Sequence, residues 1–408
     1  MQATHHTTDS RFAAWRLAVA VLIMTLGAAG MYVIPVALPT VQADFGAARG
    51  AASLPFSLLM VGFGFGGLVM GRLADRHGVM VPLLIGGTCP GIGFLSAAFA
   101  PNLLVFNAIH ALVIGFAGSS ATFSPLVADT ALWWVKRRGI AVAICASGNY
   151  LGGAVWPPIM NAGIEAFGWR GTYMGLGVVC GVVIVALAFF MRERPPQHAS
   201  TASKTAIVRD HERPFGLAIA SALVLLMIAG LACCVAMSMP QVHIVAYCGD
   251  LGYGAARGAE MLSIMMAFGI VSRLASGWLS DHIGGLRTLL LGSTLQGIAL
   301  VLFLPFDGLV QLYVISALFG LFQGGIVPSY AIIVREHFPA ARTGALVGAL
   351  MMCTLFGMAL GGWMSGAIFD ATGSYRVAFW NGIAWNALNL AIATFLLRRT
   401  WQVSRQPA

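Results

Sequence analysis

The stretches Gly71-Arg72-Leu73-Ala74-Asp75-Arg76-His77-Gly78 and Gly277-Trp278-Leu279-Ser280-Asp281-His282-Ile283-Gly284 share a glycine at each end and an aspartate at the fifth position. They lie 206 residues apart in a chain of 408. Two further pairs of landmarks keep nearly the same spacing: Lys136–Gly139 with Ala341–Gly344, and Gly168–Arg170 with Ser374–Arg376. Three landmarks at one offset indicate that the second half of the chain repeats the first.

Composition places this duplicated chain in a lipid bilayer. Apolar residues make up 59% of the sequence and charged residues 9%, against roughly a quarter charged in soluble domains. So few charges cannot cover a surface that faces water, which excludes a soluble fold. No segment is typical of a cleavable signal peptide. The seven cysteines fall in or beside apolar stretches without the spacing of a metal site, so we expect no metal and no cofactor.

A helix that spans a membrane needs about 20 apolar residues, and the sequence offers twelve such stretches. They lie at about 17–39, 52–70, 79–99, 102–128, 140–164, 171–191, 215–246, 259–279, 288–306, 309–334, 343–368 and 377–397. We therefore predict an all-α, multi-pass membrane protein made of two pseudo-symmetric six-helix bundles. The predicted domains are an N-terminal bundle at 1–191, a polar cytoplasmic linker at 192–214 and a C-terminal bundle at 215–408. Internal duplication in so apolar a chain is typical of a secondary transporter.

The distribution of lysine and arginine predicts the orientation in the membrane. With the N-terminus inside, 18 of the 23 basic residues fall on the inner side and four on the outer side. Positively charged loops face the cytoplasm, so we expect both termini there, in the inner membrane of a bacterium. The same bias accounts for the net charge of +9, and no nucleic-acid partner is needed to explain it.

The motif at 71–78 resembles the signature that the major facilitator superfamily carries between its second and third spans. The resemblance covers the whole chain and implies two six-helix bundles that rock around a central cavity. Residues 133–141 and 273–277 are similar to the monocarboxylate-porter and oxalate/formate-exchanger branches of that superfamily. Its drug exporters carry Gly-Pro in span five, where this chain has Gly152 and Gly153, so the resemblance favours uptake over efflux.

The same signature predicts a conformational switch at the inner face. A short loop with glycine at each end allows a tight turn between helices, and Asp75 is expected to lie against a neighbouring helix N-terminus, where the helix dipole favours a carboxylate. The family pattern places a basic residue after the second glycine, but Val79 stands there, so the charge partner must come from within the motif. The residues expected to form the switch are Asp75, Arg72, Arg76, Asp129 and Asp281.

Arg273 is the one basic residue that falls well inside a predicted span. It lies eight residues before Asp281 at the inner mouth, about 12 Å along a helix and near the middle of the bilayer core. An arginine there costs about 2.5–3.5 kcal/mol, and its counterpart in the first half is Gly67, so the fold does not require the charge. A guanidinium matches a carboxylate with two parallel hydrogen bonds, and the resembling porters hold their anion here. A salt bridge that closes the inner gate is the alternative.

Proton coupling needs a group that titrates, and His110 in span four is the candidate. It lies about 14 Å into its span, at the depth of Arg273; a hydrogen-bonded structural histidine is the alternative. His243 falls late in span seven, where a gate role or plain solvation is expected. The other polar residues expected to contact the substrate are Asn107, Asn149, Gln323 and Tyr32, each of which can instead bridge helices. The glycine runs in spans two, five and eleven predict close-packed helix interfaces.

The sequence thus favours a transporter of a small organic anion, a monocarboxylate, that takes up its substrate with protons or in exchange for a counter-anion and functions as a monomer. Uptake of a neutral or heterocyclic nutrient such as a vitamin, or efflux of a small molecule, is the alternative on the same fold. A membrane sensor or enzyme is a third hypothesis. It is disfavoured because no cluster of catalytic side chains gathers at one depth and the linker is too short to form an output domain.

Overall fold

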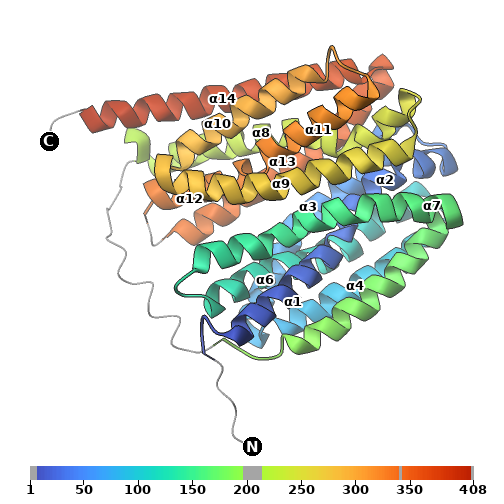
Figure 1. Ribbon diagram of the computed structural model, residues 1–408, viewed down its shortest axis with the longest axis horizontal. Helices are drawn as coiled ribbons and strands as arrows, with labels where there is room; N and C mark the ends of the chain where they lie inside the picture. Colours follow the sequence, from blue (N-terminus) through green and yellow to red (C-terminus); the bar gives the residue numbers. More distant parts are fainter. Residues whose placement is uncertain (1–6, 196–213, 340–341, 406–408) are drawn as a thin grey trace, which may run out of the picture. The chain divides into compact units, whose positions relative to one another are not determined.

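A computed structural model of the chain describes residues 7–195, 214–339 and 342–405, and the regular elements in these ranges are helices (Figure 1). Most of the predicted linker, residues 196–213, lies outside the described residues. The helices of the first half are α1 (Arg11–Gly27), α2 (Ala29–Asp44), α3 (Arg49–His77), α4 (Met80–Ala98), α5 (Leu103–Ala108), the π-helix η1 (Ile109–Ser119), α6 (Ser120–Trp133) and α7 (Arg138–Phe190). Those of the second half are the 3₁₀ turn η4 (Pro214–Gly216), α8 (Ile219–Asp250), α9 (Ala255–Ile283), α10 (Gly285–Leu302), α11 (Leu309–Gln323), α12 (Ile326–His337), α13 (Thr343–Thr372) and α14 (Tyr375–Arg405).

Twelve membrane crossings can be counted within the described residues. Ten helical segments there are long and apolar enough to cross a membrane. One of them is α7, whose 53 residues bend at Gly168 (φ 70°, ψ 168°) and so form two crossings. Helix α14, with 31 residues, is long enough for one more crossing, which completes the predicted twelve. The predicted fold, twelve helices in two six-helix bundles, is confirmed.

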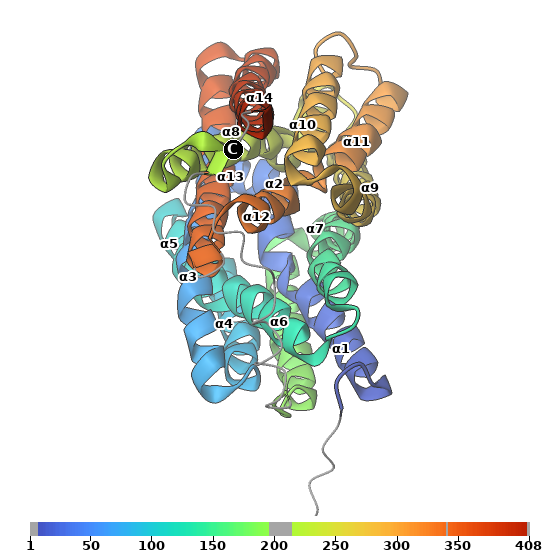
Figure 2. The ribbon, with the colours of Figure 1, turned by 90° about the vertical axis from the view of Figure 1, so that its left-hand side faces the viewer.

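The described residues form two compact units. The first consists of residues 7–47 and 58–195, and the second of residues 48–57 and 214–405, so α3 is divided between them. In the first unit α7 packs against α1 and α4 (Figure 1). In the second, α8 packs against α13 and α14, and α9 packs against α11 (Figure 2). The predicted domain boundaries, at residues 191 and 215, remain a prediction.

The repeated motif has the same backbone in both halves. Gly78 and Gly284 both have φ of +84°, a value that residues with a Cβ rarely adopt, and each follows the last residue of a long helix. Gly71 and Gly277 instead lie inside α3 and α9, where a Cβ would meet nothing within 4 Å. The prediction that the motif is a loop with a turning glycine at each end is therefore wrong at its first glycine, because helical hydrogen bonding continues to His77 and Ile283.

A second landmark repeats down to its hydrogen bond. Arg170 donates to the carbonyl of Ala98 over 2.7 Å, and Arg376 donates to the carbonyl of Leu304 over 3.5 Å. Both the arginines and the carbonyls are 206 residues apart. In the first unit this arginine lies just after the bend of α7 and binds the end of α4. In the second unit it lies at the start of α14 and binds the chain just after α10, which supports the pseudo-symmetry predicted from sequence.

The predicted close-packed glycine interfaces are present in both units. A Cβ at Gly62 or Gly66 of α3 would overlap carbonyl oxygens of η1, and one at Gly357 or Gly361 of α13 would overlap carbonyl oxygens of α8. In span five, a Cβ at Gly152 would lie 2.7 Å from a carbonyl oxygen of α1. Small residues let helix backbones approach this closely in membranes, where packing replaces the hydrophobic effect as the driving force.

Candidate functional site

Arg273 lies in the middle of α9, and its side chain is half-buried. The same helix meets the junction between α11 and α12 with almost no side chain between the two backbones. A Cβ at Gly324 of that junction would overlap the carbonyl oxygen of Gly269 and would lie 2.9 Å from Cβ of Ser272, the residue before Arg273. The structure therefore places the arginine beside a break in the tenth span.

The break leaves a buried amide pair in the second unit. Helix α11 ends at Gln323 and α12 begins at Ile326. Gln323 is fully buried, and its Oε1 accepts a hydrogen bond of 2.8 Å from Nε2 of Gln241 on α8. Nε2 of Gln323 has no hydrogen-bond partner among the described residues. A buried amide donor without a partner is costly, which makes this junction a candidate binding element.

The fourth span is irregular at the matching position. Its middle is η1, a π-helix of 11 residues that ends at Ser119, and Ser119 lies 206 residues before Gly325. Long π segments are rare and concentrate at functional sites. Transporters also place their substrate sites at discontinuous helices near the middle of the bilayer. Sequence reasoning missed both breaks, although the glycines at 115, 118, 324 and 325 were a signal for them.

His110 and Asn107 lie near the start of η1, inside the first unit. The ring of His110 is fully buried, and its Nδ1 donates a hydrogen bond of 2.8 Å to the carbonyl of Phe106 one turn earlier. The ring packs against Phe106 and Tyr173, with centroid distances of 4.2 and 5.9 Å. Asn107 is also buried. These contacts favour the structural alternative for His110, because surrounding side chains occupy the space that a substrate would need.

Tyr32 and Asn149 come together in the first unit. The hydroxyl of Tyr32 donates to Oδ1 of Asn149 over 3.1 Å, joining α2 to α7. Asn149 also borders a narrow hollow that is too small to admit a water molecule. The other residues around the hollow are Met24, Gly27, Ala28, Met31, Phe63, Ser119, Thr122 and Phe123. The residues around it are mostly apolar, with two hydroxyls and one amide, and in this conformation the hollow leaves no room for a substrate.

The predicted switch residues do not form a network in this conformation. Arg72, Asp75 and Arg76 are exposed on the last turns of α3, and Asp281 is exposed near the end of α9. No side-chain hydrogen bond or ion pair joins them to another residue that the structure describes. The contact expected for Asp75 is instead made in the second unit by Glu336, whose two carboxylate oxygens both lie 3.1 Å from the backbone nitrogen of Gly285 at the start of α10.

Asp129 has a partner that the sequence did not indicate. Its carboxylate accepts two hydrogen bonds from Arg16 of α1, from Nε over 3.0 Å and from Nη2 over 3.1 Å. Nη2 of Arg16 also donates to the carbonyl of Met191 over 3.2 Å. The structure thus pairs Asp129 with Arg16 rather than with Arg72 or Arg76. Arg16 thus joins α1 to α6 through Asp129 and to the residue after α7 through Met191.

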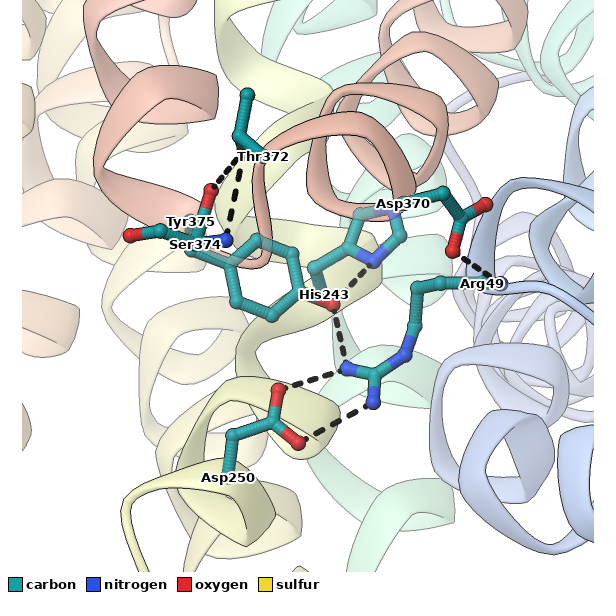
Figure 3. Close-up of polar contacts among 7 residues, drawn as sticks. All are labelled: Arg49, His243, Asp250, Asp370, Thr372, Ser374 and Tyr375. Atoms are coloured by element: carbon teal, nitrogen blue, oxygen red, sulfur yellow. Dashed lines mark hydrogen bonds and ion pairs between the residues drawn. The ribbon is translucent and has the colours of Figure 1, made fainter.

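A second charged cluster surrounds Arg49 at the start of α3 (Figure 3). The guanidinium of Arg49 donates to both oxygens of Asp250, over 2.8 and 3.1 Å, and to the hydroxyl of Tyr375 over 2.9 Å. The backbone nitrogens of Arg49 and Gly50 donate to the two oxygens of Asp370 over 2.8 and 2.7 Å. One carboxylate therefore caps the helix and another binds its first side chain. All these residues belong to the second unit.

His243 extends this cluster into the core of the second unit (Figure 3). Its Nε2 lies 2.8 Å from the carbonyl of Gly362, which can only accept, so Nε2 carries the proton and Nδ1 accepts the hydroxyl of Tyr375 over 3.0 Å. The ring is fully buried. Plain solvation, one of the two roles expected for His243, is therefore wrong.

Metal ligands do not gather in the described parts of the chain. All seven cysteines are free thiols, and five of them are buried. Within the described ranges no three His, Cys, Asp or Glu side chains are placed to hold a metal ion.

Comparison with known proteins identifies the family. The model of the Major Facilitator Superfamily matches residues 20–310 and 261–407. The chain is 28% identical to monocarboxylate transporter 13 of Bos taurus over 323 residues, 77% of this chain and 73% of that one. It is also 28% identical to the uncharacterized MFS-type transporter YcxA of Bacillus subtilis over 348 residues, 83% of each chain.

The fold has solved counterparts. A bacterial homologue of the human lysosomal transporter Spinster, solved in an inward-facing and unoccupied conformation, superimposes with a TM-score of 0.73. The match covers 98% of this chain and 100% of the other, at 15% sequence identity. Twelve spans, an internal repeat and a family match along nearly the whole sequence agree: the chain belongs to the major facilitator superfamily, a family of membrane transporters.

Proposed function

We propose that this transporter carries a small organic anion, a monocarboxylate, and that Arg273 binds its carboxylate. The observation that carries the proposal is the position of Arg273, a half-buried residue in α9 that directly follows Ser272, which contacts the break in span ten. A guanidinium at this depth is costly unless it serves a function. Curated relatives named monocarboxylate transporters, at 28% identity or below, support the same substrate class.

The remaining contacts would come from amides and hydroxyls at the irregular helices. Gln323, with its unfilled Nε2 donor, suits a carbonyl or hydroxyl oxygen of the substrate. The Tyr32–Asn149 pair offers the same kind of contact from the first unit. Asn107 would add a further amide contact, whereas His110 takes the structural role that its packing favours. In the other state of the transport cycle, the exposed Asp75, Arg72, Arg76 and Asp281 would find their partners.

The proposal also covers the coupling of transport, its direction and the location of the protein. Transport is coupled to protons or to exchange of a counter-anion, and its direction is uptake. The protein works as a monomer in a bacterial inner membrane, with both termini in the cytoplasm because 18 of its 23 basic residues fall on that side. It catalyses no chemical conversion of its substrate.

Uptake into proteoliposomes tests the proposal. Radiolabelled lactate, pyruvate, formate and oxalate should be supplied one at a time, with Arg273→Ala and Arg273→Lys beside the unchanged protein. We expect Arg273→Ala to abolish uptake of the accepted acid and Arg273→Lys to retain a fraction of it, since lysine keeps the charge but loses the planar fork. Arg257→Ala removes an exposed arginine of the same helix and should transport normally. Normal uptake by Arg273→Ala would refute the carboxylate role.

A neutral or heterocyclic nutrient is the second candidate. The buried amide pair of Gln241 and Gln323 favours it, because amides suit carbonyl groups and ring nitrogens as well as carboxylates. Competition separates the two candidates. An excess of simple carboxylates should block uptake of a labelled monocarboxylate and leave uptake of a labelled vitamin unchanged. Extrusion of a preloaded compound would support efflux, the remaining alternative.

A further inference from the structure

The first turns of α3 are attached along one face of α13. The contact points on α13 lie three or four residues apart and so share a face of the helix: Ala359, Gly362, Gly366 and Asp370. Ser57 donates to the carbonyl of Ala359 over 2.6 Å. A Cβ at Gly366 would lie 2.8 Å from Cα of Gly50. Residues 48–57 therefore lie against the second unit, although the rest of α3 belongs to the first.

Charge-assisted hydrogen bonds hold the outer end of this segment. Arg49 is 11% exposed and binds Asp250, which is 35% exposed. The guanidinium also lies 4.4 Å from the ring centroid of Phe369. Because water reaches Asp250, the pair can exchange partners at modest cost, unlike the fully enclosed pair of Arg16 and Asp129.

The internal repeat shows which other partner Asp250 can take. Its counterpart 206 residues earlier is Asp44, which pairs with Arg170 over 2.9 Å within the first unit. The counterpart of Arg170 is Arg376. Among the described residues, however, the guanidinium of Arg376 donates to the carbonyl of Leu304 and forms no ion pair, and Asp250 binds Arg49 instead. The second unit therefore departs from the repeat at this contact, where Arg49 takes the place that Arg376 would have.

We propose that Asp250 is a two-partner switch. In the present conformation it holds Arg49 and so keeps residues 48–57 on α13. When these residues leave α13 during the transport cycle, Asp250 pairs with Arg376, as Asp44 pairs with Arg170. The carboxylate stays paired in both states, which lowers the free-energy cost of opening. This proposal goes beyond the cargo and does not depend on its identity.

A cysteine reporter measures the opening without any substrate. Ala52 is 1% exposed in this conformation, so Ala52→Cys, in a protein whose seven native cysteines are replaced by serine, should react slowly with a membrane-impermeant maleimide. We expect Arg49→Ala to speed the labelling by about tenfold, which corresponds to about 1.4 kcal/mol, and Asp250→Asn to speed it as well. Arg257→Ala is the matched control, since Arg257 is 53% exposed near the start of α9 and forms an ion pair with Glu260 of the same helix. Its labelling should not change.

The predicted pairing of Asp250 with Arg376 is tested separately, by substituting Arg376. Arg376→Ala should slow the labelling of Cys-substituted Ala52, because the open state loses its ion pair, and it should have no effect when Asp250→Asn is already present. Unchanged labelling in Arg49→Ala, with normal membrane insertion, would overturn the switch. Should Arg49→Ala fail to insert, Asp250→Asn decides the same point. Labelling that is unchanged or faster in Arg376→Ala would overturn the exchange of partners.

Discussion

The buried pair of Arg16 and Asp129 allows a quantitative test of what holds the first unit together. The two side chains are 3% and 7% exposed and share two hydrogen bonds. Asp129→Asn keeps the shape of the side chain but leaves the charge of Arg16 buried. Removing one partner of a buried pair costs about 3–5 kcal/mol. We expect the lower end, about 3 kcal/mol, because Arg16 keeps its bond to the carbonyl of Met191 and its position 5.0 Å from the ring centroid of Trp133.

The double variant Arg16→Gln/Asp129→Asn supplies the decisive comparison. Two neutral amides can hydrogen-bond to each other, so the double variant should lose only about 1 kcal/mol, the typical net value of one hydrogen bond. The coupling energy between the two sites should then be at least about 2 kcal/mol, the range for residues in direct contact. Unfolding by sodium dodecyl sulfate in dodecyl maltoside micelles, followed by far-UV circular dichroism, measures each free energy of unfolding.

An ion pair on the surface serves as the control for these free energies of unfolding. Arg257→Gln removes the exposed ion pair with Glu260, while Glu260 keeps its hydrogen bond from Tyr313, and this variant should leave the unfolding curve unchanged. If the losses from Arg16→Gln and Asp129→Asn simply added in the double variant, the two residues would act independently, and the reasoning from their pairing would fail.

Three further predictions use the same unfolding assay. Gly361→Val should lose about 1–3 kcal/mol, since its side chain would overlap the carbonyl of Val235, whereas Gly344→Ala in the same helix meets no neighbour within 4 Å and should be neutral; equal stability of both would contradict the close packing. His110→Asn should lose about 1–3 kcal/mol with the KM for uptake unchanged, because the ring packs among aromatic side chains; a raised KM with normal stability would restore it as a substrate contact. Glu336→Gln should lose about 0.5 kcal/mol, the value of a carboxylate at a helix N-terminus, and the opposite result, no loss, would show that this contact does not matter.

Much of the fold could be predicted because its causes are local in the sequence. Apolar stretches of about 20 residues predict spans whatever packs against them. Gly78 and Gly284 end the two copies of the repeated motif, and their shared φ of +84° explains why glycine stands at both positions. The glycines of spans two and eleven predicted backbone contact for the same kind of reason, since only glycine leaves room for it.

Side-chain partners were the part that only the tertiary structure decided. Arg16 and Asp129 lie 113 residues apart, and Arg49 and Asp250 lie 201 residues apart. The residues around one partner in the sequence therefore cannot predict which residue the other partner is. A hydrogen bond is made or lost within about half an ångström, whereas hydrophobic periodicity places a side chain only on a face of its helix. The same limit explains why counting residues along the span predicts a depth for His110 but could not reveal the aromatic side chains that enclose it. Depth comes from counting residues along one helix, and surroundings come from the helices that pack against it.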